Sequence, residues 1–480
     1  MKSAFATPAP RRLSNGTMAS YGFGAVAYGV KDAGFGTFLL LFYNQVIGLD
    51  PQTVGLVIML ALVADAFIDP AVGFFSDRTR GRWGRRHPWM YASALPIAIG
   101  WIALWNPPSL SDPMLLVWLF GCSVIVRSAV SCYEVPSVAL TPELTSDFDE
   151  RTRIMAYRYL FGWAGGLTML LSAYLYFLAP TSTFPNGLLN RAGYPGFALL
   201  GAALMMIAIL VSALGTHGEI ERLPQPAIER QTLRQNFSQL WATVQNRAFV
   251  ILMIASVCAY TNQGISYAMS NYLYTYVWGF RGMILVWLTV ALFVGVILAF
   301  IIAPRVSKRG NKHVAAAWFA IGGMALNTAP YWLRLLGLFP HIGDQALVPL
   351  LFCFFMLGTA SNISAFILGA SMMADVVEDS EVKTGRRSEG VFFAGSFFVQ
   401  RCTSGIGILA AGTILTIAGF PKKAVPGLVP VGTIDRLTII YSLVYLAIAI
   451  IAALMFRRFP FGRAEHEARL AKLVAPDVSG

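Results

Sequence analysis

Ionisable side chains interrupt several long apolar stretches of this 480-residue chain. A charge inside a membrane-spanning segment is costly, so it usually faces a water-filled cavity or an opposite charge and marks a candidate functional site. The residues of this kind are Lys31, Asp32, Asp65, Asp69, Arg127, Glu134, Arg158 and Arg401. The acids among them are the groups through which the chain would bind a small cation or a proton.

Three of the acids have a spacing that suits cation binding. Asp65 and Asp69 are four residues apart, so they share one face of a helix. Two carboxylates on one face repel each other unless a cation or protons neutralise them. Glu134 would join them from another apolar stretch, and converging carboxylates are hard oxygen ligands for a small cation. The sequence therefore predicts a cation-binding site at Asp65, Asp69 and Glu134.

The basic members of the set offer a second interpretation. The acids could pair with Arg127, Arg158 or Arg401 only to hold helices together. The two interpretations are compatible, because a salt bridge that exchanges with cation binding would couple an ion to a substrate. We expect Arg127 and Arg401 to form such charge pairs. A guanidinium stays charged at physiological pH, so a proton would have to move through Asp or Glu.

The composition indicates a membrane protein. Hydrophobic residues make up 56% of the chain and charged residues only 12%, and the apolar blocks have the length of about 20 residues that a bilayer requires. The net charge of +12 lies mainly in short loops, which argues against nucleic-acid binding. The first twenty residues predict no cleaved signal peptide. The cysteines are expected to be free thiols, and neither cysteine nor histidine spacing predicts a metal cluster.

Apolar runs predict an all-α membrane protein with twelve transmembrane helices in two six-helix bundles, an arrangement typical of transporters with pseudo-symmetric halves. The predicted spans are 22–48, 53–76, 88–106, 114–142, 153–179, 194–216, 249–279, 283–304, 313–335, 346–376, 389–419 and 436–457. The predicted domains are an N-terminal tail at 1–20, bundles at 21–216 and 249–458, a linker at 217–248 and a C-terminal tail at 459–480.

Basic residues in alternate loops predict the orientation. Positive loops face the cytoplasm, so both termini, the linker and the loops after the second and eighth spans are expected there. The motif DRTRGRWGRRHP begins at Asp77, and its arginines are expected to pair with acids of neighbouring loops as an inner gate. The predicted gate residues are Asp77, Arg78, Arg85, Arg86, Asp375 and Glu378, with Asp147, Asp149, Glu150 and Asp379 as further candidate partners.

Four segments resemble the glycoside–pentoside–hexuronide:cation symporter family of the major facilitator superfamily. They are SYGFGAVAYGVKD (20–32), ADAFIDPAVGFFSDRTRGRWGRRHPW (64–89), YEVPSVALTPELTSDFDERTRIMAYR (133–158) and MADVVEDSEVKTGRRSEGVFFAGSFFVQR (373–401). They run from the first to the eleventh span in the family's order. The resemblance implies the major facilitator fold, a multi-pass protein of the bacterial inner membrane and symport of a sugar with Na⁺ or H⁺.

The resemblance also implies roles for individual residues. Asp65, Asp69 and Glu134 match the family's cation-binding acids of spans 2 and 4. Asp32, Arg158 and Glu134 match its substrate-binding positions, and Arg401 matches a lysine of span 11. The implied partners are a coupling cation and a small-molecule substrate, with no cofactor and no enzyme activity; a monomer is expected.

Two departures affect the predicted substrate. Val138 stands where the family's sugar permeases have a tryptophan, and Val130 where they have a tyrosine; Tyr267, Tyr272, Tyr274, Tyr276 and Trp278 could compensate for this loss. The family also includes lysolipid carriers with the same acids, so a lipid or other amphiphile is an alternative substrate. A polytopic membrane enzyme is a remote alternative, because the loops show no catalytic constellation.

Overall fold

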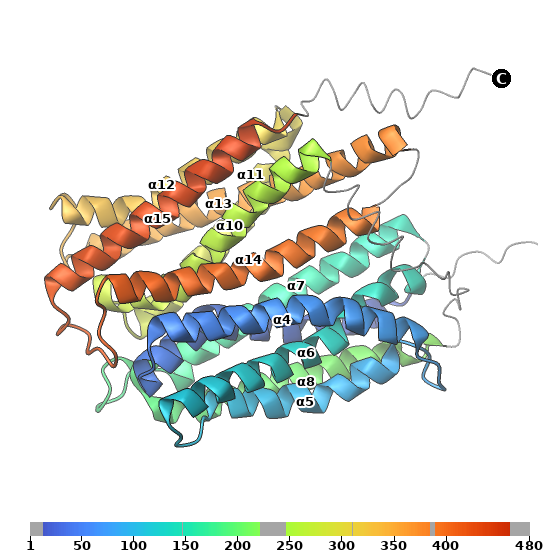
Figure 1. Ribbon diagram of the computed structural model, residues 1–480, viewed down its shortest axis with the longest axis horizontal. Coiled ribbons are helices and arrows are strands. Elements are labelled where there is room, and N and C mark those ends of the chain that lie inside the picture. The colour runs from blue at the N-terminus through green and yellow to red at the C-terminus, as the bar shows by residue number, and fades with distance from the viewer. Residues whose placement is uncertain (1–12, 146, 221–245, 310, 385–388, 461–480) are drawn as a thin grey trace, which may run out of the picture. The chain divides into compact units, whose positions relative to one another are not determined.

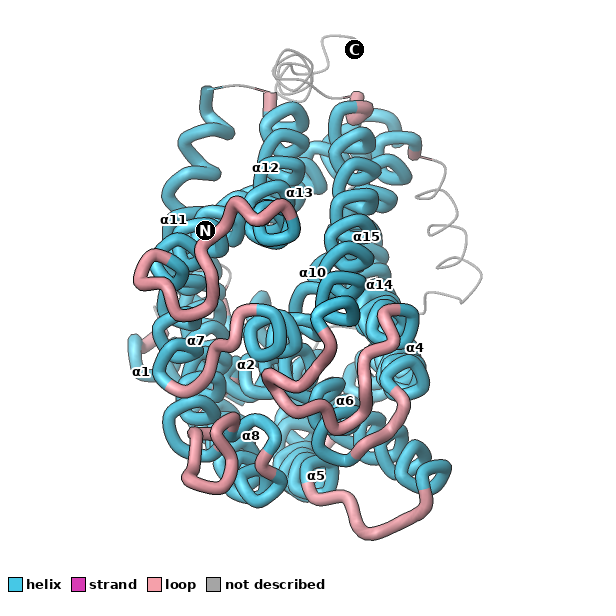
Figure 2. The backbone as a smooth tube through the Cα atoms, turned by 90° about the vertical axis from the view of Figure 1, so that its left-hand side faces the viewer, coloured by secondary structure: helices cyan, strands magenta, loops and turns pink. Residues whose placement is uncertain are grey.

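The computed structural model describes residues 13–145, 147–220, 246–309, 311–384 and 389–460. Within these ranges every regular element is a helix, and the remaining residues form loops and turns (Figure 2). The described residues pack into two compact units. The first unit takes its residues from 1–39 and 60–228, and the second takes them from 40–59 and 229–480.

Helices of the first half of the chain follow the predicted spans. They are α1 (Asn15–Phe23), α2 (Ala25–Ala33), α3 (Leu39–Leu41), α4 (Pro51–Arg78), α5 (His87–Trp105), α6 (Asp112–Leu144), α7 (Phe148–Ser172) and α8 (Tyr194–His217). The first span, α1 to Ile47, also contains π-helical turns at Gly34–Phe38 and Phe42–Ile47. A third π-helical turn, Ala173–Phe177, extends α7.

The second half contributes six long helices. They are α10 (Arg247–Tyr272), α11 (Met283–Arg309), α12 (Lys312–Leu335), α13 (Leu347–Thr384), α14 (Glu389–Ile417) and α15 (Val431–Arg457). A π-helical turn, Leu273–Val277, extends α10. Eleven helical segments of the described chain are long and apolar enough to cross a membrane. The one predicted span outside these eleven, 313–335, corresponds to α12, whose 24 residues extend about 36 Å, so the predicted all-helical membrane fold is confirmed.

Packing partners repeat between the two units. In the first unit α5 packs on α6 and α8 (Figure 1), and α7 packs on α1 and α2. In the second unit the helices six spans later make the same pairs: α12 packs on α13 and α15, and α14 packs on α10. This correspondence is what a duplicated bundle predicts, and it is much clearer in the packing than in the loop sequences.

Glycines allow the paired helices to approach backbone to backbone. A Cβ atom on Gly29 of α2 would overlap the carbonyl oxygen of Gly162 on α7, and one on Gly165 would lie 2.7 Å from the Val26 carbonyl oxygen. The second unit repeats this device, because a Cβ atom on Gly264 of α10 would lie 2.5 Å from the Ser404 carbonyl oxygen of α14. These glycines therefore permit the close approach of the paired helices in both units.

We expect Gly29→Ala to destabilise the protein. Its new methyl group meets backbone atoms that cannot rotate away, and overpacking of this kind costs about 1–3 kcal/mol. The matched control is Gly121→Ala on α6, where no neighbouring atom lies within 4 Å of the added Cβ. There alanine should be neutral or stabilise the helix by up to about 1 kcal/mol. Thermal unfolding in detergent measures both, and equal unfolding temperatures for the two variants would contradict the packing argument.

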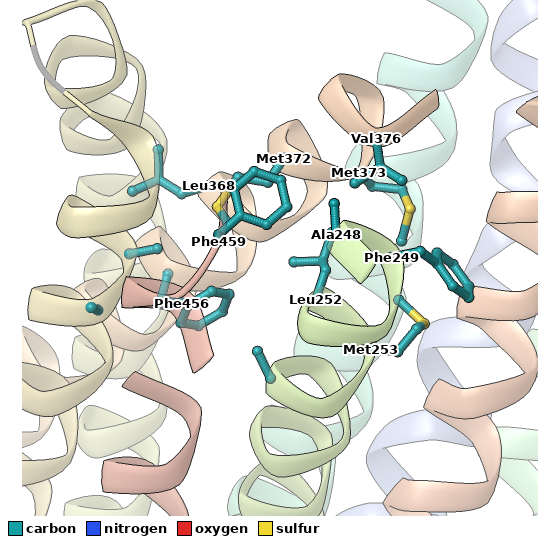
Figure 3. Packing of buried hydrophobic residues seen from close by; sticks show 14 of the residues in the cluster. Ala248, Phe249, Leu252, Met253, Leu368, Met372, Met373, Val376, Phe456 and Phe459 are labelled. Carbon is teal, nitrogen blue, oxygen red and sulfur yellow. The ribbon is translucent and has the colours of Figure 1, made fainter. Parts of the chain in front are cut away.

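A hydrophobic cluster closes one end of the second unit. Figure 3 shows Phe249 and Met253 of α10 beside Met373 of α13, with Phe456 and Phe459 from the end of α15 in the same cluster. Every one of these five side chains is at most 8% exposed. The cluster fixes the ends of three helices to one another through dispersion contacts rather than hydrogen bonds.

Polar side chains at the end of the first span are buried within the second unit. Asn44 and Gln45 are 1% and 3% exposed. Tyr272 Oη donates a hydrogen bond to Asn44 Oδ1 (2.9 Å), and Tyr276 Oη donates one to Gln45 Oε1 (3.2 Å). The Ala424 backbone N–H also donates to Gln45 Oε1 (2.8 Å). These bonds satisfy two amide side chains that would otherwise be costly to bury.

Candidate functional site

Asp65 of α4 forms a buried ion pair with Arg127 of α6. Arg127 Nη2 lies 2.6 Å from Asp65 Oδ2, and Nε donates to the same oxygen at 3.1 Å. Ser131 Oγ donates to the other carboxylate oxygen, Oδ1, at 2.9 Å. The two charged side chains are only 2% and 5% exposed. A buried pair needs such additional hydrogen bonds, because the charges have lost their hydration.

The spacing of residues along α6 positions the partners of Asp65. Arg127 and Ser131 are four residues apart on α6, so both reach Asp65 from one face. The Arg127 guanidinium also lies 5.5 Å from the centre of the ring of Phe35, in the π-helical turn after α2, within the range of a cation–π interaction. Sequence analysis did not select Ser131, although its spacing from Arg127 was a usable signal.

Asp69 and Glu134 are both partly buried on the same two helices. Asp69 interacts electrostatically with Cys132 of α6, and Glu134 interacts with Arg158 of α7. The structure thus brings α4, α6 and α7 together at the predicted acids. It does not gather the three acids into one metal-type cluster: across the described residues, no three Asp, Glu, His or Cys side chains form such a group.

Arg158 belongs to a buried polar network. Its Nη1 donates to Ser137 Oγ at 2.8 Å and to Tyr21 Oη at 3.4 Å. Tyr21 Oη in turn donates to the Ser137 carbonyl oxygen at 2.6 Å. Tyr133 Oη donates to Ser212 Oγ at 2.9 Å, which extends the network to α8. The predicted substrate residue Arg158 is therefore held between α1, α6 and α7, and Tyr21, Ser137 and Ser212 are members that sequence analysis missed.

Asp32 lies in a more open environment than the other acids. Its side chain is 51% exposed, and Lys31 Nζ lies 3.8 Å from Asp32 Oδ1. Lys31 is itself 4% exposed, with Nζ 4.2 Å from the centre of the Tyr28 ring. Asp32 is thus accessible in the first unit, whereas its neighbour is fixed against an aromatic ring.

The arginines of the loop after α4 converge on Glu143, near the end of α6. Arg85 Nη2 and Arg86 Nη2 lie 2.8 and 3.0 Å from Glu143 Oε1. Arg86 Nη1 also lies 2.6 Å from Asp77 Oδ1. Arg78 instead lies over the ring of Phe74, 3.3 Å from its centre. Sequence analysis predicted the arginine pairs but did not name Glu143 as their acid.

The acids that were named as candidate partners have other contacts. Asp147 Oδ1 accepts a hydrogen bond from the Glu150 backbone N–H (2.9 Å) and caps α7. Glu150 Oε1 accepts one from the Leu13 backbone N–H (3.1 Å). The side chains of Asp149, Glu378 and Asp379 lie outside the described residues.

The second unit has a comparable ion pair six spans later. Lys312 Nζ, at the start of α12, lies 3.0 Å from Asp375 Oδ1 of α13. In the first unit, Arg85 and Arg86 link the start of α5 to Glu143 of α6. In the second unit, Lys312 links the start of α12 to α13 in the same way. Arg401 is partly buried on α14, and its pairing with the acids of the first unit remains a prediction.

We expect Glu143→Gln to lower stability strongly for a single charge change. The Glu143 side chain is 9% exposed and contacts two arginines, and breaking a buried pair costs about 3–5 kcal/mol. The control is Asp435→Asn, whose pair with Arg334 is 2.9 Å long but 35% exposed on the acid side; such a pair is worth about 0–1 kcal/mol. Thermal unfolding of both variants checks the difference, and a larger loss for Asp435→Asn would overturn this ranking.

The two valines that stand at the expected aromatic positions of α6 differ in exposure, and whether the tyrosines and the tryptophan of residues 267–278 compensate for them stays a prediction. Val130 is 3% exposed and Val138 is 44% exposed, so Val138 leaves an apolar surface one turn after Glu134. Tyr272 and Tyr276 are engaged with Asn44 and Gln45, as described above. Tyr274 and Trp278 pack in aromatic pairs within the second unit, and Tyr267 is 36% exposed.

Comparisons with known proteins identify the family. Residues 20–463 match the family model described as MFS/sugar transport protein. An isoprimeverose transporter of Lactiplantibacillus pentosus is 26% identical, over 80% of this chain and 76% of its own. A glucuronide carrier protein homolog of Escherichia coli is 25% identical, over 85% of each chain. A sodium-dependent lysophosphatidylcholine symporter of Gallus gallus is 23% identical, over 94% of this chain and 87% of its own.

Solved structures show the same fold. A D-xylose–proton symporter superposes with a TM-score of 0.62 at 13% identity, over 92% of this chain and 97% of its own. A nucleoside transporter gives the same TM-score and identity, over 93% of this chain and all of its own. With the helical membrane fold and the family match over nearly the whole sequence, the chain belongs to the MFS/sugar transport protein family and, within the major facilitator superfamily, to the glycoside–pentoside–hexuronide:cation symporters.

Proposed function

We propose that this transporter couples the movement of one cation to the uptake of a sugar, glycoside or uronide by alternating access. The observation that supports this most strongly is the set of buried charges on α2, α4, α6 and α7. Charges at membrane depth are rare and mark ion or substrate pathways. A protein that needed only helix packing would not require Asp69 and Glu134 beside the pair that Asp65 already makes with Arg127.

The substrate class follows from chemistry and from relatives. Isoprimeverose and glucuronide are named for the relatives described above, and both are glycosides. Arg158 and the exposed Asp32 supply charged hydrogen-bonding groups in the first unit, which suit hydroxyl-rich ligands. Arginine also forms forked hydrogen bonds with carboxylates, so Arg158 would favour a uronide over a neutral sugar.

Coupling would proceed through Glu134. This acid interacts with Arg158, which we assign to the substrate, and it lies on the helix that faces Asp69. Neutralising one of these acids weakens the electrostatic attraction on Arg158 and changes its availability for a ligand. Ion and substrate binding would then influence each other through one arginine.

An amphiphile is the second candidate substrate. The exposed Val138 provides an apolar surface where a sugar-stacking ring is expected, and a lysophosphatidylcholine symporter is among the relatives. The acyl chain of a lysolipid would pack against such a surface, whereas a pyranose would stack on an aromatic side chain.

The test is uptake by the purified protein in liposomes. A panel of labelled sugars, glycosides and uronides, with a lysolipid as the comparison ligand, is presented under an imposed sodium gradient, an imposed proton gradient or neither. We expect gradient-driven accumulation of at least one glycoside or uronide. Transport of the lysolipid alone would show that the substrate is an amphiphile and not a sugar. Uptake at the same rate with and without the two gradients would refute coupling.

A further inference from the structure

We propose that Arg127 acts as a built-in cation at Asp65, so that this carboxylate does not bind sodium and the transporter couples to protons through Asp69 and Glu134. This inference rests on the proposed cation-coupled transport. Arg127 is then a residue that determines ion selectivity, and not only a link between helices.

Both oxygens of Asp65 are already engaged. Oδ2 accepts two hydrogen bonds from the Arg127 guanidinium, at 2.6 and 3.1 Å, and Oδ1 accepts one from Ser131 at 2.9 Å. A sodium ion at Asp65 would have to displace these donors or sit beside a guanidinium. Because arginine does not deprotonate at physiological pH, its charge cannot be removed to make room.

The guanidinium is also held in place on its other side. The Arg127 guanidinium lies 5.5 Å from the ring centre of Phe35, in the π-helical turn after α2, and its side chain is 5% exposed. Contacts with this turn of the first span and with α4 therefore fix it from two spans besides its own. An arginine with this little exposure has few alternative positions into which a binding ion could push it.

The charged groups inside the first unit carry one excess negative charge, which a single proton can neutralise without a coordination shell. Among the described residues at least five residues inside the ends of the predicted spans, the charged groups of the first unit comprise four acids and three bases, which leaves one negative charge. They are Lys31, Asp32, Asp65, Asp69, Arg127, Glu134 and Arg158. A proton on one carboxyl supplies that charge without further ligands, whereas sodium needs several hard oxygen ligands.

Other titratable groups lie on the same packed helices. They include Tyr21 and Tyr28 on α1 and α2, Cys122, Cys132 and Tyr133 on α6, and Tyr157 and Tyr159 on α7. Tyr21 and Tyr133 are tied into the network of Arg158, and a tyrosine or cysteine would release its proton only well above neutral pH. The carboxyls are accordingly the groups that exchange a proton under physiological conditions.

Sodium binding to the purified protein tests this inference without a substrate. Thermal unfolding is measured in sodium, potassium and choline chloride at equal ionic strength. We expect the wild type to unfold at the same temperature in all three salts. In Arg127→Gln, sodium should raise the unfolding temperature above the values in potassium and choline chloride, because a like charge has left the site.

Matched variants separate selectivity from damage. Arg127→Lys keeps a positive charge and should stay insensitive to sodium. The double variant Asp65→Asn with Arg127→Gln removes both charges, so it should fold without a buried unpaired acid and show no gain of sodium binding. Arg334→Gln removes an arginine from the ion pair of the second unit and should not create a sodium response.

The outcomes are decisive in either direction. Selective sodium stabilisation of the wild type overturns the inference, and this measurement does not depend on any variant folding. A folded Arg127→Gln protein that remains indifferent to sodium also overturns it. If liposomes show no substrate uptake under any gradient, the proposed function fails, while the sodium measurements still decide whether Arg127 blocks the ion at Asp65.

Discussion

Arg158→Gln is expected to abolish transport and to destabilise the protein strongly. Arg158 is 8% exposed, donates to Ser137 and Tyr21 and interacts with Glu134. Removing it leaves a carboxylate and two hydroxyl groups without their charged partner, at a cost of about 3–5 kcal/mol. Unfolding temperature and uptake at a substrate concentration well below saturation should both fall, the latter about 100-fold if 3 kcal/mol of binding is lost.

Arg153→Gln is the control on the same helix. Arg153 is exposed and donates to Asn15 Oδ1 at 3.0 Å, so its loss should change stability by less than about 0.5 kcal/mol. Arg158→Lys keeps the charge without the planar fork and should recover stability more than transport. Wild-type uptake by Arg158→Gln in intact liposomes would show that this arginine has no part in substrate handling.

Asp69→Asn is expected to remove coupling while leaving exchange intact. Asparagine has nearly the shape of aspartate but cannot carry or lose a proton, so the site no longer alternates between charged and neutral forms. Accumulation driven by an ion gradient should be lost, whereas exchange of labelled for unlabelled substrate across the same liposomes should continue. The comparison of the two assays on one preparation is the measurement.

The matched change is Asp112→Asn, in the exposed first turn of α6. It removes one acid from the same unit and should leave both accumulation and exchange as in the wild type. Gradient-driven accumulation that survives in Asp69→Asn would move the coupling site to another acid, and loss of exchange as well would mean that Asp69 is needed for binding.

Most of the fold could be predicted because the bilayer sets the length of apolar runs. The predicted spans 194–216 and 283–304 correspond to Tyr194–His217 and Met283–Arg309. The first span begins earlier than predicted, at Asn15, because Ser14 Oγ caps the helix by accepting a hydrogen bond from the Thr17 backbone N–H at 2.9 Å. Apolar composition does not reveal such a polar start, but a capping residue does.

The candidate site could be predicted by residue type more than by partner. The charges inside the spans could be recognised from the sequence because placing a charge in the bilayer costs free energy. Which arginine meets which acid depends on helix packing over separations such as the 62 residues between Asp65 and Arg127, which no local pattern records. Glu143 was not predicted for a related reason. It lies near the end of a span, where a carboxylate costs little free energy, so its position in the sequence does not mark it as a site residue.

The buried amides of the first span have a consequence for biogenesis. Asn44 and Gln45 enter the membrane early in synthesis, yet Gln45 Oε1 awaits the Ala424 N–H that lies 379 residues later. At a translation rate of about 5–20 residues per second, that wait lasts roughly 20–75 s. During this time Gln45 Oε1 lacks its final donor, so we expect the first span to reach its native packing only after the last helices have been inserted.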